Sequence, residues 1–315
     1  MQAGQVDAVV IGRNEGARLI ACLDSLAKQV RHLVYVDSGS TDGSVAAATA
    51  RGARVVQLDM SQPFTAARAR NAGLAVLEAP DFVQFVDGDC EVAPGWIAAA
   101  LRAMAAHPRA VVVCGRRRER RPEVSVYNRL CDREWDTPIG PALACGGDAL
   151  MRFAAVQAVG GYDPGLIAGE EPDLCLRLRR AGGEIWRIDA EMTLHDAAMT
   201  RFGQWWQRSR RAGHAFAEGA FRNGAPPERH WVAETRRALI WGAGVPLAAL
   251  LAGALHPAGG LILLAWPLQV LRLSRRMGPE AALFSVLGKL PEAQGALGFH
   301  LNQWRGRKRG LIEYK

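Results

Sequence analysis

Short apolar runs alternate with amphipathic stretches through the opening part of the chain. The apolar runs predict strands near residues 6–11, 32–36, 53–58, 82–86 and 110–115, and helical spacing predicts helices near 16–28, 43–51, 65–78 and 95–106. This alternation is typical of an α/β fold with a mostly parallel sheet flanked by helices. We therefore expect several strands to end at one edge of that sheet.

The pattern changes after residue 115. Residues 116–141 are irregular and charged, which predicts a linker helix, and residues 143–151 are expected to return to the sheet. Residues 170–181 predict a helix that ends at Gly182-Gly183, and residues 201–222 predict a long polar helix rich in Trp and Arg. We expect one domain over residues 1–222, with halves over 1–115 and 116–222, followed by a helical extension over 223–315.

The extension contains two uncharged apolar runs, residues 238–255 and 261–271, separated at His256-Pro257. Arginines precede the first run and follow the second, at positions 236, 237, 272, 275 and 276. Positive charge at both outer ends indicates an apolar hairpin over 238–271 with both ends on the cytosolic side of a membrane. The second run is short for a full span, so a re-entrant or interfacial hairpin, two spanning helices and two buried helices of a soluble extension all remain open. The stretch from 279 to 315 predicts an amphipathic surface helix with a basic tail.

Candidate chemistry begins where the strand near 82–86 ends, at Asp87-Gly88-Asp89. Acids at this position project from the carboxyl edge of the sheet, where open α/β sheets bind ligands. Carboxylate oxygens are suitable ligands for Mg²⁺ or Mn²⁺. The alternative interpretation is an ordinary turn, in which Asp and Gly are common.

Five further segments accompany this one: Asn14-Glu15, Asp37-Ser38-Gly39-Ser40-Thr41-Asp42-Gly43, Ala69-Arg70-Asn71-Ala72-Gly73, Gly160-Gly161-Tyr162-Asp163-Pro164 and Gly169-Glu170-Glu171-Pro172-Asp173-Leu174. Together, and in this order, they resemble the family 2 glycosyltransferases, which have the GT-A fold. The resemblance covers roughly residues 5–215. It implies that residues 1–115 bind a nucleotide and that residues 116–222 bind an acceptor.

The resemblance implies a donor site at the first strand ends. Residues expected to bind the nucleotide-sugar are Ile11, Gly12, Arg13, Glu15, Asp37, Ser38, Arg70, Asp87, Gly88 and Gly147. The family often has two consecutive aspartates where this chain has Asp37-Ser38, which alters the contact with the base. Arg70 is expected to reach the diphosphate, and its alternative is a solvated helix face.

The resemblance also implies metal and base positions. Asp89 is the expected ligand of Mn²⁺ or Mg²⁺, with Asp87 acting directly or through water and His195 as a further ligand. Glu171 corresponds to the family's general base, where Asp is usual, and Glu170 and Asp173 are candidates for orienting the acceptor. A structural role remains open for His195, and helix-dipole complementarity for the acids near 170.

Composition and charge narrow the classes of molecule that the protein is expected to bind. The formal net charge is +8, but the basic clusters lack the interleaved aromatic residues of a nucleic-acid stacking platform. An anionic membrane surface or a phosphate-bearing substrate accounts better for the excess. The six cysteines are scattered without a Cys-x-x-Cys pair, so we expect neither disulfides nor a zinc site, as in a reducing cytosol.

Together, these expectations predict an inverting, metal-dependent glycosyltransferase at the cytoplasmic face of the inner membrane. It would move one sugar from a UDP- or GDP-linked donor to a lipid-linked or polysaccharide-precursor acceptor, because the motif of processive family members is not matched at Gln204-Trp205-Trp206-Gln207-Arg208. Two alternatives are a sugar-1-phosphate nucleotidyltransferase and an inactive membrane-anchored assembly factor. The first would want a Gly-rich loop after the first strand, which residues 11–15 do not form.

Overall fold

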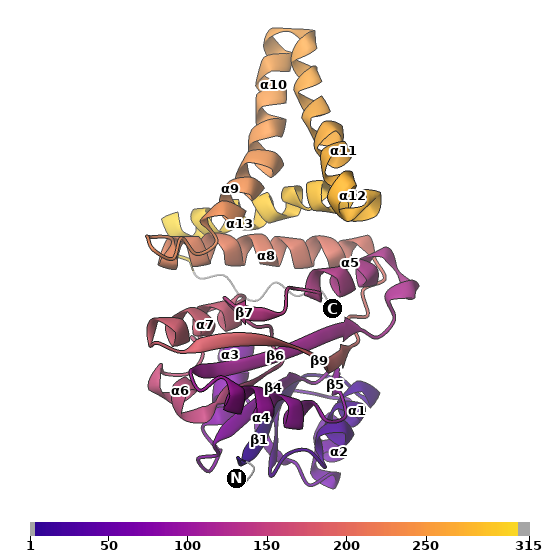
Figure 1. Cartoon of the computed structure of the whole chain (residues 1–315). Coiled ribbons are helices and arrows are strands. Elements are labelled where there is room, and N and C mark those ends of the chain that lie inside the picture. Colours follow the sequence, from indigo (N-terminus) through magenta and orange to yellow (C-terminus); the bar gives the residue numbers. More distant parts are fainter. Residues whose placement is uncertain (1–3, 308–315) are drawn as a thin grey trace. The chain divides into compact units, whose positions relative to one another are not determined.

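The computed structural model describes residues 4–307, and the chain divides into two compact units, Met1–Thr200 and Arg201–Lys315 (Figure 1). The sequence-based boundary at residue 222 differs from this division. Helix α8 (Phe202–Asn223) packs along α13 (Lys289–Trp304), so it belongs with the C-terminal helices.

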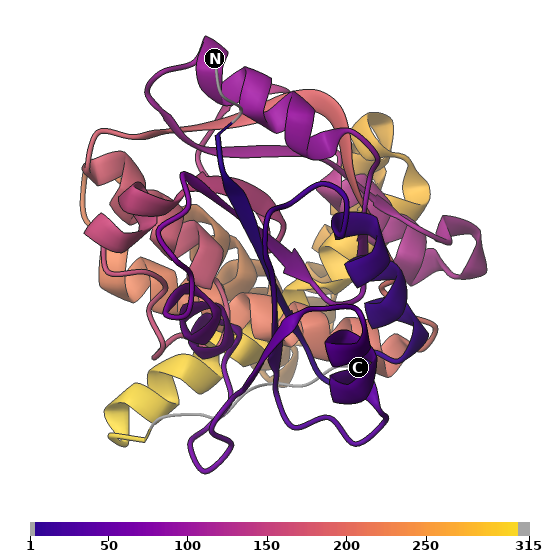
Figure 2. The ribbon, with the colours of Figure 1, turned by 90° about the horizontal axis from the view of Figure 1, so that it is seen from below.

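Strands and helices alternate in unit 1 as predicted up to residue 115, except that a short unpredicted strand, Cys90–Val92, follows the strand that ends at Asp87. The strands are β1 (Val6–Gly12), β2 (Leu33–Asp37), β3 (Arg54–Gln57), β4 (Phe82–Asp87), β5 (Cys90–Val92), β6 (Ala110–Glu119), β7 (Gly140–Ala142), β8 (Ala149–Arg152) and β9 (Glu184–His195). The helices are α1 (Ala17–Leu26), α2 (Ser44–Ala50), α3 (Ala66–Leu74), α4 (Trp96–Ala106), the 3₁₀ turn η1 (Pro122–Val124), α5 (Val126–Trp135), α6 (Phe153–Ala158) and α7 (Glu170–Arg180). Helices lie on both sides of the strands (Figure 2).

Within the described residues the strands form one nine-stranded sheet in the order β3-β2-β1-β4-β8-β6-β9-β5, with β7 on β9. The β3-β2-β1-β4 half is parallel, as expected, whereas β8, β5 and β7 pair antiparallel to their neighbours. This is the α/β architecture expected of a GT-A fold, with a mixed second half. The parallel half aligns the ends of three strands, because Gly12 is in register with Asp37 and Ile11 with Asp87.

One predicted boundary is wrong. The sequence pattern predicts a linker at residues 116–119, but these residues extend β6 and pair with residues 191–195 of β9. Three of these four residues are arginines, which stay at the sheet through ion pairs such as Arg116 with Asp189 (2.7 Å) and Arg118 with Glu191 (3.4 Å). The linker helix itself is present as α5.

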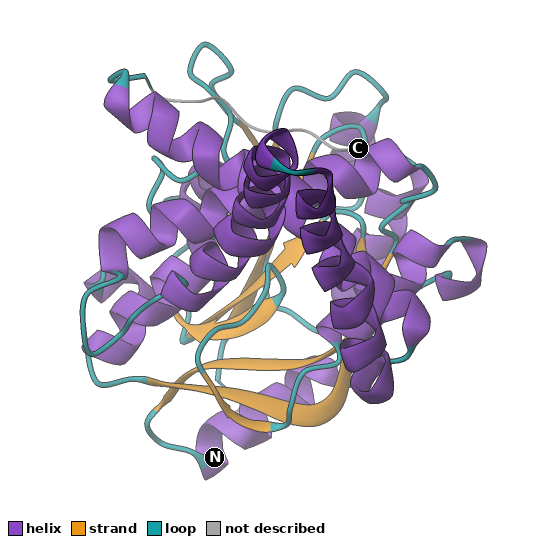
Figure 3. Ribbon diagram, turned by 90° about the horizontal axis from the view of Figure 1, so that it is seen from above, coloured by secondary structure: helices purple, strands orange, loops and turns teal. Residues whose placement is uncertain are grey.

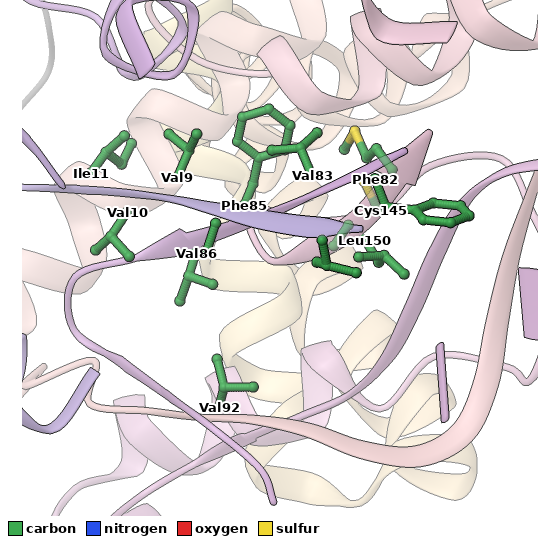
Figure 4. Packing of buried hydrophobic residues seen from close by; sticks show 14 of the residues in the cluster. Val9, Val10, Ile11, Phe82, Val83, Phe85, Val86, Val92, Cys145 and Leu150 are labelled. Carbon is green, nitrogen blue, oxygen red and sulfur yellow. The ribbon is translucent and has the colours of Figure 1, made fainter. Parts of the chain in front are cut away.

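The core of unit 1 lies on both faces of β1 and β4. Successive side chains of a strand point to opposite faces, so Val9 and Phe85 lie on one side of the sheet while Val10 and Val86 lie on the other (Figure 4). All four are buried. A strand buried on both faces reads as a continuous apolar run, which explains the sequence pattern.

Helix α3 packs unusually close to this sheet at Gly73. A Cβ at that position would lie 2.3 Å from Cγ1 of Val9 and 3.1 Å from Cγ2 of Val36. Two residues earlier, Asn71 accepts a hydrogen bond from the Tyr162 N–H (2.9 Å) and donates to the Tyr162 carbonyl oxygen (2.7 Å). The Ala69–Gly73 segment therefore seats α3 and joins it to the Gly160–Pro164 segment.

The regular secondary structure of unit 2 is entirely helical among its described residues. It contains α8, α9 (Val232–Leu239), the π-helical turn η2 (Ile240–Gly244), α10 (Val245–Leu255), the 3₁₀ helix η3 (Pro257–Leu264), α11 (Ala265–Met277), α12 (Pro279–Leu287) and α13. The two apolar runs form the predicted hairpin, whose arms meet at its tip (Figures 1 and 3). Lys308 and Arg309 of the predicted basic tail lie outside the described residues.

The first arm of the hairpin belongs to a continuous 24-residue helix, Val232–Leu255, that is long and apolar enough to cross a membrane, with a mean hydropathy of 1.9 in its most apolar window. Only 11% of that window is buried. Leu250 is 70% exposed and Leu255 is 90% exposed. Such exposure is unlike that of a helix in the core of a soluble domain.

The base of the hairpin is held by close contacts between helix backbones. A Cβ at Gly213 of α8 would lie 2.0 Å from the Glu292 carbonyl oxygen of α13, and one at Gly295 would lie 2.0 Å from the Arg210 carbonyl oxygen of α8. A Cβ at Gly242 would lie 1.8 Å from the Lys289 carbonyl oxygen. Glycine at these positions lets α8, η2 and α13 approach to backbone contact.

Candidate active site

Strand β4 brings the acidic pair to the carboxyl edge of the sheet. Asp87 is its last residue, and Asp89 follows after a one-residue turn at Gly88. The Gly88 N–H donates to the Ile11 carbonyl oxygen at 2.8 Å, and a Cβ at Gly88 would lie 3.1 Å from that oxygen. Glycine therefore allows the acidic turn to lie directly against the end of β1, beside Gly12 and Glu15.

Asp87 lies between two arginines. Its Oδ1 accepts a hydrogen bond from Arg70 Nη2 at 2.9 Å, and its Oδ2 lies 3.5 Å from Arg117 Nη2. Its backbone N–H donates to Oδ1 of Asp148 at 3.1 Å. The position of this carboxylate is thus fixed by neighbouring elements.

Arg70 is the centre of the acidic cluster. Only 2% of its side chain is exposed, which excludes the solvated helix face considered from the sequence. Besides Asp87, Arg70 Nη1 lies 3.0 Å from Glu170 Oε1 and 3.1 Å from Glu171 Oε1. Its guanidinium also lies over the Tyr162 ring, 5.4 Å from the centroid. One buried cation therefore joins α3, β4 and α7.

Glu170 and Glu171 open helix α7 after Gly169, whose φ of 81° requires the left-handed region that glycine adopts readily. The pKa of Glu171 is raised to about 7, mainly by burial and also by the charge of Glu170, while Arg70 opposes the rise. Near neutral pH this carboxyl can both take up and release a proton, which a general base requires.

Asp173 forms its ion pair outside the cluster around Arg70. Its Oδ2 pairs with Arg177 Nε at 2.9 Å, one turn along α7. Arg177 in turn donates to the carbonyl oxygens of Val159 and Gly161, both at 2.7 Å. Asp173 thus fixes the arginine that anchors the Gly160–Pro164 segment.

Asp89 faces His195, the last residue of β9. Oδ2 of Asp89 lies 3.4 Å from Nε2 of His195, and Nδ1 of His195 lies 3.7 Å from Oε2 of the buried Glu119. The antiparallel pairing of β5 with β9 sets Cys90 opposite His195, and potential ligand atoms of Asp89, Cys90 and His195 all lie within 4.8 Å of one another. These three buried residues could hold a metal ion.

The surroundings favour a neutral imidazole at His195. Burial lowers its pKa, the charge of Arg117 lowers it further, and Glu119 opposes the change. Glu119 is itself held by the N–H groups of Arg121 (3.2 Å) and Ala197 (3.0 Å). A neutral imidazole whose other nitrogen faces a carboxylate is the usual form of a metal-binding histidine.

Three residues of this edge were not selected from the sequence: Asp148, Arg117 and Glu119. Asp148 is fully buried and accepts a hydrogen bond from the Thr193 hydroxyl at 2.8 Å as well as from the Asp87 N–H. Arg117 lies over the Trp135 ring, 4.8 Å from the centroid. Asp148 directly follows Gly146-Gly147. Its position next to Gly147, a predicted donor-site residue, is the sequence signal that points to it. Arg117 and Glu119 lie in the stretch misassigned as a linker.

The residues predicted to contact the nucleotide lie at the adjacent ends of β1 and β2. Asp37 is 4% exposed, and its carboxylate accepts hydrogen bonds from the Tyr35 hydroxyl and from the Gly39 and Ser40 N–H groups, each at 3.0 Å. Its present contacts therefore shape the loop after β2. Asn14 accepts from the Thr41 N–H (2.7 Å) and donates its backbone N–H to the Ser40 hydroxyl (2.9 Å), which joins this loop to the one after β1.

The remaining predicted donor residues lie around the same two loops. The N–H of buried Ser38 donates to the Gly12 carbonyl oxygen at 3.1 Å, so the ends of β1 and β2 stay side by side. Glu15 pairs with Arg18 at 2.7 Å, and Arg13 is exposed. The structure thus brings the predicted donor residues to one sheet edge, in register with the acidic turn.

Gly147 lies against the Asp87–Arg70 ion pair. A Cβ there would lie 2.6 Å from Asp87 Oδ2 and 2.7 Å from Arg70 Nη2. Gly147→Ala is expected to displace this pair and to destabilise the protein by about 1–3 kcal/mol, the usual cost of overpacking, with a loss of activity. Thermal unfolding and turnover measure both effects. Gly203→Ala, where a Cβ would meet nothing within 4 Å, is the control, and equal stability of the two variants would contradict this geometry.

The sequence was compared with known families and curated proteins. Residues 7–157 match the profile of the family described as glycosyl transferase family 2. A TPR repeat-containing protein of Synechococcus elongatus is 33% identical over 127 residues, which are 40% of this chain and 30% of that protein. The pre-mycofactocin glycosyltransferase of Mycobacterium tuberculosis is 31% identical over 169 residues, which are 50% of this chain and 35% of that protein. The chain thus spans about a third of the length of these relatives.

Solved structures share the fold at low sequence identity. A mannosyltransferase from Pyrobaculum calidifontis, in complex with GDP-Man and Mn²⁺, has a TM-score of 0.61 and 22% identity, covering 92% of this chain and 88% of that one. Glucosyl-3-phosphoglycerate synthase from Mycobacterium tuberculosis, in complex with Mn²⁺, UDP-Glc and phosphoglyceric acid, has a TM-score of 0.50 and 21% identity over 71% of this chain and 81% of that one. Both likenesses concern the fold.

Proposed function

Because residues 7–157 of this chain form a family 2 glycosyltransferase domain on a GT-A fold, we propose that the protein is an inverting, metal-dependent enzyme that transfers one sugar from a nucleotide-diphosphate sugar. The proposed acceptor is a lipid-linked or polysaccharide-precursor glycan. The proposed location is the cytoplasmic face of the inner membrane.

The observation that carries the proposal is the ion-pair centre at Arg70. It holds Asp87, on the donor side, within hydrogen-bond distance of the same guanidinium that pairs with Glu171, the proposed base. Donor-side acid and base are therefore fixed relative to each other before substrate binds. Pre-organisation of reacting groups is a major source of rate enhancement.

The Asp89–His195 pair fits a divalent cation. A carboxylate oxygen and a neutral imidazole nitrogen facing each other at 3.4 Å are ligands that Mn²⁺ accepts, whereas Mg²⁺ prefers oxygen alone. The structural relatives bind Mn²⁺ with their nucleotide-sugars. When bound, such an ion would neutralise the leaving diphosphate.

Glu171 would accept the proton of the acceptor hydroxyl. At the N-terminus of α7 it is largely buried, and its pKa of about 7 leaves it a competent base at neutral pH. An acceptor hydroxyl deprotonated on the face of the sugar opposite the diphosphate attacks in a single displacement, which inverts the anomeric centre. Glu170 would orient the base through their shared contact with Arg70.

The exposed apolar hairpin supports the membrane part of the proposal. A lipid-linked acceptor presents its sugar at the membrane surface, so an enzyme anchored there meets its substrate directly. The absence of a Gly-rich loop after β1, where Asn14 instead bonds to Ser40 and Thr41, is unlike a nucleotidyltransferase.

The test of the proposed function is an assay of the full chain with a panel of UDP- and GDP-sugars and Mn²⁺. We expect release of a nucleoside diphosphate from one donor, which names the base and the sugar. Pyrophosphate release from a nucleoside triphosphate and a sugar-1-phosphate would identify a nucleotidyltransferase instead. No turnover and no Mn²⁺-dependent nucleotide binding would leave an inactive assembly factor.

Asp89→Asn is expected to weaken Mn²⁺ binding at least about tenfold, because it removes the charge that faces His195. Calorimetric titration of the nucleoside diphosphate with and without Mn²⁺ measures the effect, and the metal-dependent gain in affinity should vanish. Asp24→Asn, at an exposed residue of α1 that pairs with Arg51, is the control and should bind as the native chain does. Unchanged Mn²⁺ dependence in Asp89→Asn would remove it as a ligand.

A further inference from the structure

We propose that the apolar hairpin, residues 238–271, enters an anionic bilayer from one face and turns back inside the hydrocarbon core, with the arginines at its base on acidic headgroups. The inference rests on the membrane location in the proposed function and goes further, since it specifies the lipid charge and the depth of the tip. It requires no particular donor or acceptor.

The first argument is length. The first arm contains 18 residues, 238–255, and a helix of that length measures about 27 Å at 1.5 Å per residue. The hydrocarbon core of a bilayer is about 30 Å thick. With Arg237 held at the headgroups, the charge-free arm therefore ends about 3 Å short of the far side of the core, although the whole helix from Val232 would be long enough to cross it.

The second argument is the chemistry of the tip. Residues 252–264 around the turn contain no charged side chain, and His256 is their one polar residue. The turn satisfies its own backbone: Pro257 has no N–H, the Ala258 N–H donates to Nδ1 of His256 (3.1 Å) and the Gly259 N–H donates to the His256 carbonyl oxygen (2.8 Å). Internal satisfaction of backbone groups is the condition for irregular structure in hydrocarbon. A loop that emerged on the far side would have no such need.

The third argument is the close approach of the two arms at the tip. A Cβ at Gly259 would lie 2.2 Å from the Ala252 carbonyl carbon, so the return arm contacts the backbone of α10 directly. Small residues at helix crossings are the means by which helices associate in lipid, where burial of apolar surface adds nothing.

The fourth argument is the composition of α10. All eleven of its residues, Val245–Leu255, are apolar, and leucines are exposed around it at 247, 250, 251 and 255. A helix that docks on a protein partner through one face keeps polar residues on the other. Since α10 has no polar face, a bilayer is the occupant that fits it.

The fifth argument is charge. Arg236 and Arg237 on α9 and Arg272, Arg275 and Arg276 on α11 are all exposed and lie at the ends of the arms away from the tip. Juxtamembrane clusters of basic residues are attracted to anionic lipid headgroups. We call these five arginines the basic collar.

The lipid part of the proposal is tested by flotation of the full chain with vesicles of phosphatidylcholine alone or with 30% phosphatidylglycerol. The native chain should float with both and bind the anionic vesicles at least tenfold more tightly, an advantage that 0.5 M salt removes. Arg275→Glu with Arg276→Glu should lose this advantage, while the equally charged control Lys28→Glu with Arg102→Glu, at exposed residues of unit 1, should keep it. Equal loss in both double variants would overturn the role of the collar.

The depth of the tip is tested with Ala258→Cys in sealed anionic vesicles and a membrane-impermeant maleimide. The native chain is the blank because its six cysteines are buried, and Ala233→Cys, at an exposed residue of α9, reports the outer face. We expect Ala233→Cys to react from outside and Ala258→Cys to react only after detergent is added.

Two results of the labelling experiment and one of the flotation experiment would overturn the proposal. Reaction of Ala258→Cys with reagent trapped in the lumen would mean that the hairpin spans the bilayer. Reaction of Ala258→Cys with reagent added outside would mean that the tip is not inserted. If the chain floated with vesicles only when another protein was bound to it, a protein and not the bilayer would be the partner of the hairpin. Nucleotide-sugar turnover in detergent is measured in parallel, so loss of membrane binding with full turnover refutes this inference and leaves the proposed reaction intact.

Discussion

Arg70→Met is expected to lower the free energy of unfolding by about 3–5 kcal/mol and to abolish sugar transfer, because it leaves buried carboxylates without their cation. Arg70 is 2% exposed and lies within 3.1 Å of oxygen atoms of Asp87, Glu170 and Glu171. Methionine fills a similar volume, so the loss measures the charge and its hydrogen bonds rather than a cavity. Urea unfolding at pH 8 is the measurement.

The pH dependence of this loss follows from Glu171. Burial and the charge of Glu170 have already raised its pKa from 4.5 to about 7, and Arg70 opposes that rise, so without Arg70 its pKa in the folded protein rises further above the unfolded value. A group whose folded pKa is raised is most favourable to folding below its unfolded pKa, and this contribution is lost as pH rises through the folded value. The decrease in the free energy of unfolding caused by Arg70→Met should therefore be larger at pH 8 than at pH 5.

The control for Arg70→Met is Arg51→Met, which breaks the ion pair with Asp24. Both partners of that pair are partly exposed, at 29% and 57%, so its loss should cost less than about 1 kcal/mol. Arg70→Met with Glu170→Gln should regain part of the stability, because one of the unpaired charges is removed. A cost at Arg70 no greater than at Arg51 would disprove the ion-pair centre.

Glu171→Gln is expected to reduce kcat by about 10²–10⁴-fold, the usual contribution of a positioned general base. The amide keeps the shape of the side chain and cannot accept the proton. Donor affinity should stay within a few-fold of the native value, since Asp89 and the strand-end loops are untouched. Steady-state transfer assays and direct titration of the donor separate the two quantities.

A pH profile distinguishes a base from a merely structural acid. Because the pKa of Glu171 is about 7 and the base acts when deprotonated, kcat should rise with pH through about 7 and level off above it. Glu170→Gln removes a charge that raises this pKa, so its rising limb should move to lower pH while turnover above pH 8 persists. Glu123→Gln, an exposed glutamate of η1, should leave the profile unchanged. If the rising limb of the kcat profile stayed at the same pH in Glu170→Gln, Glu171 would not be the general base.

The position of the site could be predicted from the sequence because it depends on strand ends. Asp37 and Asp87 each end an apolar run, and parallel pairing with β1 then brings them to one edge. The glycine before α7 and the acids that follow it were equally local signals. Each of these features is fixed by a few neighbouring residues.

The partners within the site could not be predicted, because they depend on distant segments that fold together. Arg70 lies 100 residues from Glu170 in sequence, and helical spacing alone is as consistent with an exposed arginine. The extension of β6 could not be predicted because Arg116 and Arg118 resemble loop residues until Asp189 and Glu191 of β9 pair with them. Asp148 could not be predicted because a single acid after two glycines suggests a turn.

The tight seating of Gly73 against Val9 and Val36 gives helix α3 a part beyond packing. The same short helix carries Arg70 and Asn71, so any loosening of its contact with the sheet moves the cation away from its acids and breaks the hydrogen bonds between Asn71 and Tyr162. Warming would then inactivate the enzyme by a local change at α3 while the sheet remains folded. Loss of activity would therefore occur at a lower temperature than global unfolding.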